Sequence, residues 1–322
     1  MIEKRDHFFD NTKFILIFLV VLGHAFEGVN GSTIGTIYRL IYLFHMPCFV
    51  FILGYFCKNI SARRVVQSVW IYLVFQTLYF MFTAFFLHDP NVKLQYIWPI
   101  WILWFSLATV AWQVALPIIC IIPYRVILAF IAGIAAGYFS IFSYGLSASR
   151  VVVFLPFFLL GYSFKKNWII RIPPAVAILI FISAYIALKF FINIPVGLLY
   201  GSCSYAALGL GSFGGVDRAL LYVSSIVLIA CFFSLIPKKE TWFSRFGART
   251  LNVYLLHGFI ILHVKHMGLP QAINTTLERL AYIAGIFGLV LVLSSGPVAC
   301  LMNKITNPMS VFKNKAKWQL PK

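Results

Sequence analysis

The run "FILIFLVVLGHAFEGVN", residues 14–30, decides the class of protein, because it is almost wholly apolar yet contains two ionisable side chains. A run of this length is long enough to cross the hydrocarbon core of a bilayer as a helix. His24 and Glu27 lie in it three residues apart, which puts them on one face of that helix. Ionisable groups are costly inside a membrane and are usually functional there. The run therefore predicts a membrane protein and a functional pair of side chains.

The whole chain has the composition of a membrane protein. Of its 322 residues 61% are hydrophobic and 11% are charged, whereas a soluble domain is about half apolar and a quarter charged. We predict an all-α, polytopic integral membrane helix bundle of about ten transmembrane helices over residues 1–303, followed by a basic cytoplasmic tail, 304–322. The first run lacks a small-residue cleavage site and is predicted to be a retained span rather than a signal peptide. The ten candidate spans are 14–30, 36–57, 65–87, 97–118, 125–142, 150–164, 173–193, 219–236, 250–266 and 281–302.

The distribution of basic residues predicts the orientation. The formal net charge is +18, and nucleic acid is the usual partner of so basic a chain. Here the basic residues lie in short loops between apolar runs, which is what membrane orientation requires. With the N-terminus in the cytoplasm, 19 of the 26 Lys and Arg residues fall on the cytoplasmic side of the ten spans. We therefore expect both termini in the cytoplasm of a bacterial-type plasma membrane, with membrane lipid as a partner and no nucleic acid.

The cysteines argue against a metal centre. Six are scattered along the chain, and none forms a CxxC pair. This pattern predicts neither a disulfide framework nor a zinc site, so the cysteines are expected to be small packing residues. The longest outer connection, residues 194–218, is rich in Gly and Ser. Irregular backbone at membrane depth must be buried in protein or line water, so this segment is expected to be re-entrant or to cover a cavity.

His24 and Glu27 are predicted to be catalytic, together with His45. His24 lies ten residues into the first predicted span, about 15 Å and hence near the midplane. His45 lies about nine residues into the second, antiparallel span, so both imidazoles are expected at one cavity. Glu27 would accept the ring proton of His24 and orient the ring, which suits a general base acting on a hydroxyl. For His45, support of a helix kink at Pro47 is as plausible as catalysis. For His257, helix packing is as plausible as a chemical role.

Four polar residues are predicted at the cytoplasmic mouth of the bundle. Asp10 and Lys13 begin the first span, and Arg63 and Arg64 begin the third. Lys13, Arg63 and Arg64 are suited to the phosphates of a donor molecule, because Arg and Lys both bind phosphate. Positive-inside orientation and binding of lipid head groups explain the same basic residues without a donor. The residues alone leave three functions open. The protein could be an enzyme, a transporter or flippase with His24 and Glu27 as proton relay, or a non-catalytic membrane partner in polysaccharide assembly.

Four stretches, in order, resemble a known family. They are "FFDNTKFILIFLVVLGHAFEG" (8–28), "LFHMPCFVFILGYFCKN" (43–59), "RVVVFLPFFLLGYSFKKN" (150–167) and "FSRFGARTLNVYLLHGFII" (243–261). Together they are similar to the integral-membrane acyltransferase family 3, most closely its fucose 4-O-acetylase-like branch. The resemblance implies a ten-helix O-acyltransferase, and more narrowly an O-acetyltransferase. Its donor would be acyl-CoA, here acetyl-CoA used as substrate without a metal, and its acceptor a hydroxyl of a cell-surface or lipid-linked glycan. In such a reaction His24 would either deprotonate the hydroxyl or accept the acyl group itself as a relay, and the sequence leaves both roles open.

The resemblance also assigns residues. His24 matches the family's essential histidine, eleven positions after a basic residue, which is Lys13 here and more often Arg elsewhere. Arg63 and Arg64 match the basic pair after the second helix, and Arg150 matches the arginine ahead of "PFFLLGY". We assign Arg150 to substrate binding on this basis, and Asp10 because of its place in the polar cluster at the cytoplasmic mouth. Many relatives carry a C-terminal esterase-like domain, whereas only a basic tail follows the last span predicted here. The acceptor is therefore expected to meet the membrane domain directly or through a separate protein.

The predicted orientation can be tested with reporter fusions in the intact chain. Reporters placed after Lys166, after Lys239 and at the C-terminus should read cytoplasmic, because those loops carry the excess of Lys and Arg. Reporters near Asn91, Gly211 and Gln271 should read outside. A cytoplasmic signal at Gly211 would overturn the ten-span topology and move the Gly-rich segment to the donor side.

Overall fold

The computed structural model describes residues 6–58, 61–140 and 145–307, and these contain helices and loops without a strand. Seven helical segments among them are long and apolar enough to cross a membrane. The chain is therefore a polytopic helical membrane protein, as predicted. The end of the predicted span 125–142 and most of the predicted tail, residues 308–322, lie outside the described residues.

Each of the ten predicted ranges contains a helix. The helices that correspond to the ten ranges are α1 (His7–Phe26), α2 (Ser32–Phe56), α3 (Ala62–Met81), α4 (Trp104–Ile119), α5 (Arg125–Ala136), α6 (Ala148–Ser163), α7 (Pro174–Phe190), α9 (Gly214–Leu235), α11 (Thr250–His266) and α13 (Thr276–Leu293). Short helices between or after them are α8 (Val196–Tyr200), α10 (Ser244–Gly247), α12 (Leu269–Ala272) and α14 (Gly296–Thr306). Single 3-10 or π turns are η1 (Phe82–Phe86), η2 (Trp101–Leu103), η3 (Gly145–Ser147), η4 (Lys166–Trp168), η5 (Ala206–Leu208) and η6 (Gly211–Phe213).

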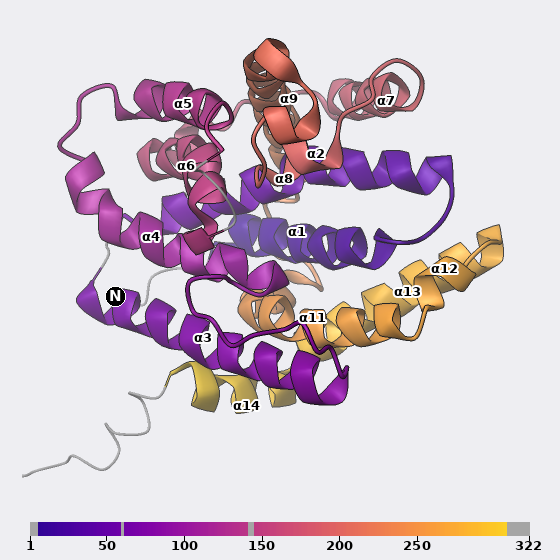
Figure 1. Ribbon diagram of the computed structural model, residues 1–322. Helices are drawn as coiled ribbons and strands as arrows, with labels where there is room; N and C mark the ends of the chain where they lie inside the picture. The colour runs from indigo at the N-terminus through magenta and orange to yellow at the C-terminus, as the bar shows by residue number, and fades with distance from the viewer. Residues whose placement is uncertain (1–5, 59–60, 141–144, 308–322) are drawn as a thin grey trace, which may run out of the picture.

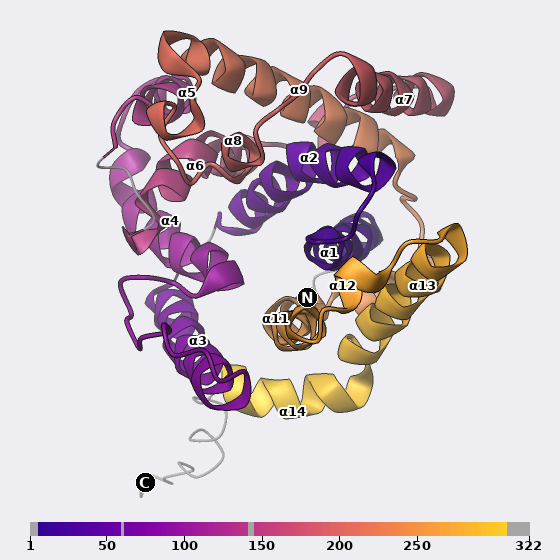
Figure 2. The same cartoon turned by 45° about the vertical axis from the view of Figure 1, so that its right-hand side comes forward.

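Helix α1 is the central element of the bundle. Figure 2 shows it nearly end-on, with α2, α11 and α13 beside it. In its most apolar window 72% of the residues are buried inside the protein, against 17% for α13 at the periphery. A spanning helix buried on most sides contacts protein rather than lipid, so its polar side chains can find partners on neighbouring helices.

Helix α1 begins earlier than the predicted span, and this changes the position of His24 within it. The side chain of Asp6 caps the helix by accepting a hydrogen bond from the backbone N–H of Phe8 at 3.1 Å. The polar residues that follow are buried, and the Asn11 amide donates to the carbonyls of Pro237 and Lys239. The helix therefore begins seven residues before the predicted start, and His24 lies in its last turn. The predicted midplane position of His24 assumed a helix start at residue 14, and its depth in a membrane stays a prediction.

The last predicted span, 281–302, is two helices rather than one. Helix α13 ends at Leu293, and α14 begins at Gly296 with a proline in its first turn. Between them Ser294 donates its hydroxyl proton back to the carbonyl of Val290 at 2.6 Å, and the chain turns. In Figure 2, α14 lies across the view while α1 and α11 point along it. The break arises because proline is favoured in the first turn of a helix and disfavoured in its interior.

Helices α2 and α6 pack with their backbones in contact. A Cβ atom placed on Gly54 would lie 2.0 Å from the carbonyl oxygen of Phe158, and one on Gly161 would lie 1.8 Å from that of Phe51. A side chain at either position would push the two helices apart. Small residues at crossing points are a general means of packing helices in membranes.

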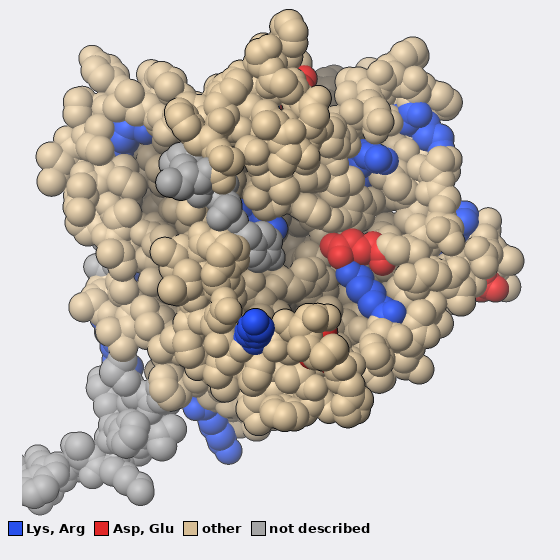
Figure 3. All heavy atoms as spheres, viewed as in Figure 1, with Lys and Arg blue, Asp and Glu red and all other residues tan. Residues whose placement is uncertain are grey.

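The outer surface is mostly apolar. Figure 3 shows tan atoms over most of one face, with few charged side chains. Large apolar side chains on the helices, such as Ile127 and Val223, are more than half exposed. Soluble proteins rarely expose apolar surface on this scale, whereas lipid-facing helices require it.

Candidate active site

The His24–Glu27 pair predicted from the sequence is formed. Nδ1 of His24 lies 2.9 Å from Oε1 of Glu27. The Tyr42 hydroxyl, from α2, donates to the same carboxylate oxygen at 3.0 Å. A carboxylate can only accept, so the proton between the pair belongs to Nδ1 of the histidine. Glu27 thereby sets the tautomer of His24 and leaves Nε2 as the nitrogen available for chemistry.

Lys265, from α11, pairs with the other oxygen of the Glu27 carboxylate, Oε2. Its ammonium nitrogen also lies 4.6 Å from the centre of the Trp101 ring. Both side chains of the ion pair are less than a quarter exposed. In this setting an unpaired carboxylate is strongly disfavoured, so Lys265 stabilises the charged form of Glu27 that accepts the His24 proton.

A large cavity of about 460 Å³ adjoins the pair. Its wall comes from α1, α2, the start of α4, α6 and the Gly-rich segment after α7. The lining residues are His24, Glu27, Tyr42, His45, Met46, Trp101, Ile102, Trp104, Arg150, Phe154, Leu199, Tyr200, Ser202 and Cys203. The predicted association of the 194–218 segment with a cavity is confirmed by Leu199, Tyr200, Ser202 and Cys203. The volume and the mixture of aromatic and polar groups suit a small organic ligand.

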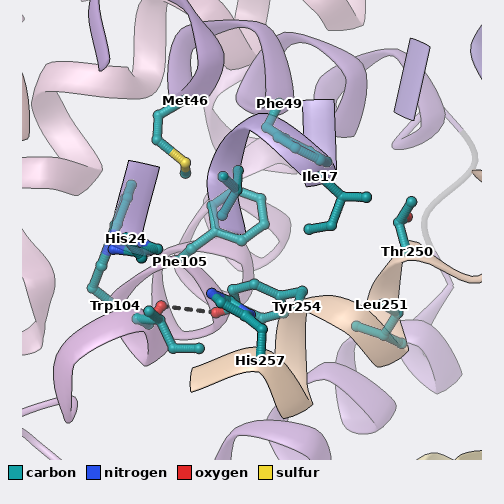
Figure 4. A pocket seen from close by; sticks show the side chains of 12 residues that line it. Ile17, His24, Met46, Phe49, Trp104, Phe105, Thr250, Leu251, Tyr254 and His257 are labelled. Atoms are coloured by element: carbon teal, nitrogen blue, oxygen red, sulfur yellow. Dashed lines mark hydrogen bonds between the residues drawn. The ribbon is translucent and has the colours of Figure 1, made fainter. Parts of the chain in front are cut away.

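A small cavity of about 160 Å³ lies on the other side of His24 and extends toward the start of α11. The lining residues are Ile17, Val20, His24, Met46, Phe49, Ile102, Trp104, Phe105, Thr250, Leu251, Tyr254 and His257. Figure 4 shows His24 near one end of this group, with Thr250 and Leu251 at the other. Four residues, including His24 and Trp104, line both cavities. His24 therefore lies at the junction of the two.

Two further histidines flank His24. His45 lines the large cavity, and its ring lies 4.6 Å from that of Tyr42, which in turn contacts His24. His257 lines the small cavity and stacks on His24 with ring centres 5.6 Å apart. The prediction that His24 and His45 share a cavity is confirmed. In each flanking ring Nδ1 lies 2.8 Å from the carbonyl oxygen four residues earlier. This is the carbonyl of Ile41 for His45 and that of Val253 for His257.

Arg150 is the only predicted substrate-binding residue that lines a cavity with His24. Its guanidinium carbon lies 4.9 Å from the centre of the Trp104 ring, and its Nε donates to the carbonyl of Tyr200 at 3.3 Å. Asp10 lies fourteen residues before His24 on the same helix, about 21 Å along the axis. The structure therefore does not bring Asp10 to the His24 site.

The predicted phosphate-binding residues lie away from His24. Lys13 pairs with Asp10 at 3.0 Å within the first half of α1. Arg63 and Arg64 are exposed in the first turn of α3, where Ser61 caps the helix. None of the three lines the large or the small cavity.

Sequence reasoning missed three contributors to the site. From the sequence, Lys265 is only one of the seven basic residues outside the predicted cytoplasmic side, His257 is divided between packing and chemistry, and Tyr42 has no predicted role. The signal in the sequence was Lys265 itself. A basic side chain at the end of an apolar run is expected to have an acidic partner. In a chain with eight acidic residues, Glu27 is the one placed in an apolar run.

Comparison with known proteins identifies the family. The family model for acyltransferase family 3, described as "Acyltransferase domain", matches residues 6–295. The chain belongs to acyltransferase family 3. The match covers the helices that build both cavities, from α1 to α13, and it favours acyl transfer over the transporter that the residues alone allowed.

Two relatives share a shorter stretch with the chain. Nodulation protein NolL of Mesorhizobium japonicum is 36% identical over 67 residues, which is 19% of this chain and 18% of that protein. Nodulation protein NolL of Sinorhizobium fredii is 36% identical over 78 residues, 20% of this chain and 21% of its own length. The match spans only about a fifth of each relative. No solved structure matches the chain.

Replacement of Lys265 tests the role of its ion pair in this acyltransferase family member. We expect Lys265→Met to lower kcat about tenfold or more with little change in the KM for the acyl donor, because Glu27 loses its charged partner. Lys265→Arg should recover most of the rate by restoring the ion pair. Lys189→Met is the matched control, since Lys189 donates to Ser32 at 2.6 Å and lines neither cavity. Equal rates for the Met and Arg variants would show that charge at this position does not matter.

Proposed function

We propose that the protein is a membrane O-acyltransferase that moves an acyl group, most simply acetyl, from acyl-CoA to a hydroxyl of a cell-surface or lipid-linked glycan. The observation that carries this proposal is the position of His24 at the junction of two cavities, with Nδ1 held by Glu27. A donor in one cavity and an acceptor in the other would meet at the free nitrogen of one imidazole.

The chemistry proposed for His24 is general base catalysis. Nε2 takes the proton of the acceptor hydroxyl as its oxygen attacks the thioester carbonyl. The carbon–sulfur bond then breaks, the new ester forms, and the proton passes from the imidazolium to the departing thiolate. Because the two cavities adjoin at His24, direct transfer needs no acyl-histidine intermediate. The Glu27 carboxylate stabilises the imidazolium between the two proton transfers.

Both cavities are mostly apolar, and they differ in size, direction and polar groups, which supports opposite roles. The small cavity leads from His24 toward the start of α11, the side that carries the predicted cytoplasmic loops. It suits the slender, largely apolar end of an acyl-CoA. The large cavity contains Arg150, Tyr200 and Ser202 among aromatic rings, which suits a polyhydroxylated acceptor. The CoA phosphates would then reach the cytoplasmic surface, where Lys13, Arg63 and Arg64 are proposed to bind them.

The proposed function is tested by acetyl transfer in membrane vesicles supplied with labelled acetyl-CoA and the glycan fraction of the host. His24→Ala should reduce transfer by a factor of about 10² to 10⁴, the usual contribution of a general base, with an unchanged amount of protein in the membrane. His266→Ala is the matched control, because His266 is exposed at the end of α11 and lines neither cavity. Near wild-type transfer by the His24→Ala variant would make His24 structural.

The proposed donor phosphate site has its own test. Replacement of both Arg63 and Arg64 by Gln should raise the KM for acyl-CoA about tenfold or more, the loss expected for one or two charge-assisted hydrogen bonds. The dependence of the rate on acceptor concentration should barely change. The control replaces Lys165 and Lys166 by Gln, which removes equal charge from another predicted cytoplasmic loop. If both double variants behave alike, Arg63 and Arg64 serve orientation rather than donor binding.

A further inference from the structure

His257, which lines the small cavity, has a buried ring nitrogen without a hydrogen-bond partner among the described residues. His257 is fully buried, and its Nε2 makes no hydrogen bond to any residue that the structure describes. Its other nitrogen, Nδ1, lies 2.8 Å from the carbonyl oxygen of Val253. A carbonyl can only accept, so Nδ1 carries the proton, and the neutral ring presents Nε2 as an acceptor. Buried polar atoms are nearly always paired, so this nitrogen points to a ligand group that donates.

The other polar groups of the wall narrow the choice of ligand. The Tyr254 hydroxyl donates to the carbonyl of Ile102 at 2.9 Å and accepts from the N–H of Ser106 at 3.1 Å. Both hydrogen bonds are therefore made within the protein, and the dashed line in Figure 4 marks the one that Tyr254 donates. Most of the remaining wall is apolar. The cavity is about the size of one known to hold a benzene molecule, ~150 Å³. The ligand is thus a slender, mainly apolar group with one N–H or O–H donor at His257.

The two imidazoles lie close enough together to contact the end of one acyl-CoA. The rings of His24 and His257 are stacked, with centres 5.6 Å apart and planes at 28°. If the thioester carbonyl reacts at His24, the N–H or O–H that donates to His257 must lie a short distance away along the same ligand chain. In every acyl-CoA an amide N–H follows the thioester sulfur after two methylene groups. Such an N–H loses its bond to water on entering the cavity and needs an acceptor there.

We infer that Nε2 of His257 accepts a hydrogen bond from the amide N–H nearest the thioester and so holds the thioester carbonyl at His24. This inference rests on the proposed function, because it takes an acyl-CoA as donor. It makes His257 a donor-binding residue. It also assigns the small cavity to the thioester end of the pantetheine arm, while the acceptor occupies the large cavity.

The test compares two small donors that differ only at the inferred hydrogen bond. S-Acetyl-N-acetylcysteamine carries the amide N–H, and S-acetyl-2-mercaptoethyl acetate has an ester oxygen in its place. Each is measured in membrane vesicles as a donor and as a competitor of acetyl-CoA. The wild-type protein should prefer the amide about tenfold, which corresponds to about 1.4 kcal/mol. His257→Phe should lower this preference to about one and raise the KM for acetyl-CoA, because Phe keeps the ring but removes the acceptor.

Two variants separate hydrogen bonding from packing. His263→Phe changes another histidine of α11, whose ring packs 5.3 Å from that of Phe86 and lines neither cavity, and it should keep the amide preference. His257→Gln retains an acceptor oxygen and should keep part of the preference, even if the Phe variant fails to accumulate. The inference is overturned if the wild-type protein transfers acetyl without preferring the amide, or if His257→Phe keeps the preference. Absence of transfer from any acyl-CoA by the wild-type protein would instead overturn the proposed function.

Discussion

The carboxylate of Glu27 is the interaction on which the site depends, because it joins three helices at one point. It accepts hydrogen bonds from His24 of its own helix, from Tyr42 of α2 and from Lys265 of α11. A carboxylate without such partners would be too costly in a bundle whose surroundings are apolar. The same contacts that satisfy the charge also orient the imidazole. Stability of the site and direction of its chemistry therefore have a common cause.

The three histidines of the site are oriented by one device. Each uses Nδ1 to donate to an acceptor on its own chain segment, a carboxylate three residues later for His24 and a carbonyl four residues earlier for His45 and His257. These contacts are local to each helix, so the tautomers do not depend on a ligand. Each ring thereby directs the same nitrogen, Nε2, away from its own helix. His24 differs in having a charged partner, which suits it to hold a proton during a reaction.

The sequence predicts the local contacts of the site but not the contacts between distant segments. The all-helical membrane class follows from the apolar runs, and the His24–Glu27 contact follows from helical spacing alone. Lys265 reaches Glu27, and His257 reaches His24, only because α11 packs against α1. No spacing in the sequence predicts this packing. The start of α1 could not be predicted from the apolar run, because the Asp6 cap extends the helix through buried polar residues. Arg150 was found only through the family resemblance, and Asp10, assigned from its place at the predicted cytoplasmic mouth, lies away from His24.

The glycine contact between α2 and α6 has a mechanical consequence. Where backbone touches backbone there is no side chain to change rotamer, so neither helix can slide or tilt at that point without breaking the contact. The two helices act as one rigid frame. One carries Tyr42 and His45, and the other carries Arg150, so these walls of the large cavity keep their spacing whatever enters it. Any widening that admits a bulky acceptor must come from the other walls, which belong to α1, the start of α4 and the segment around α8.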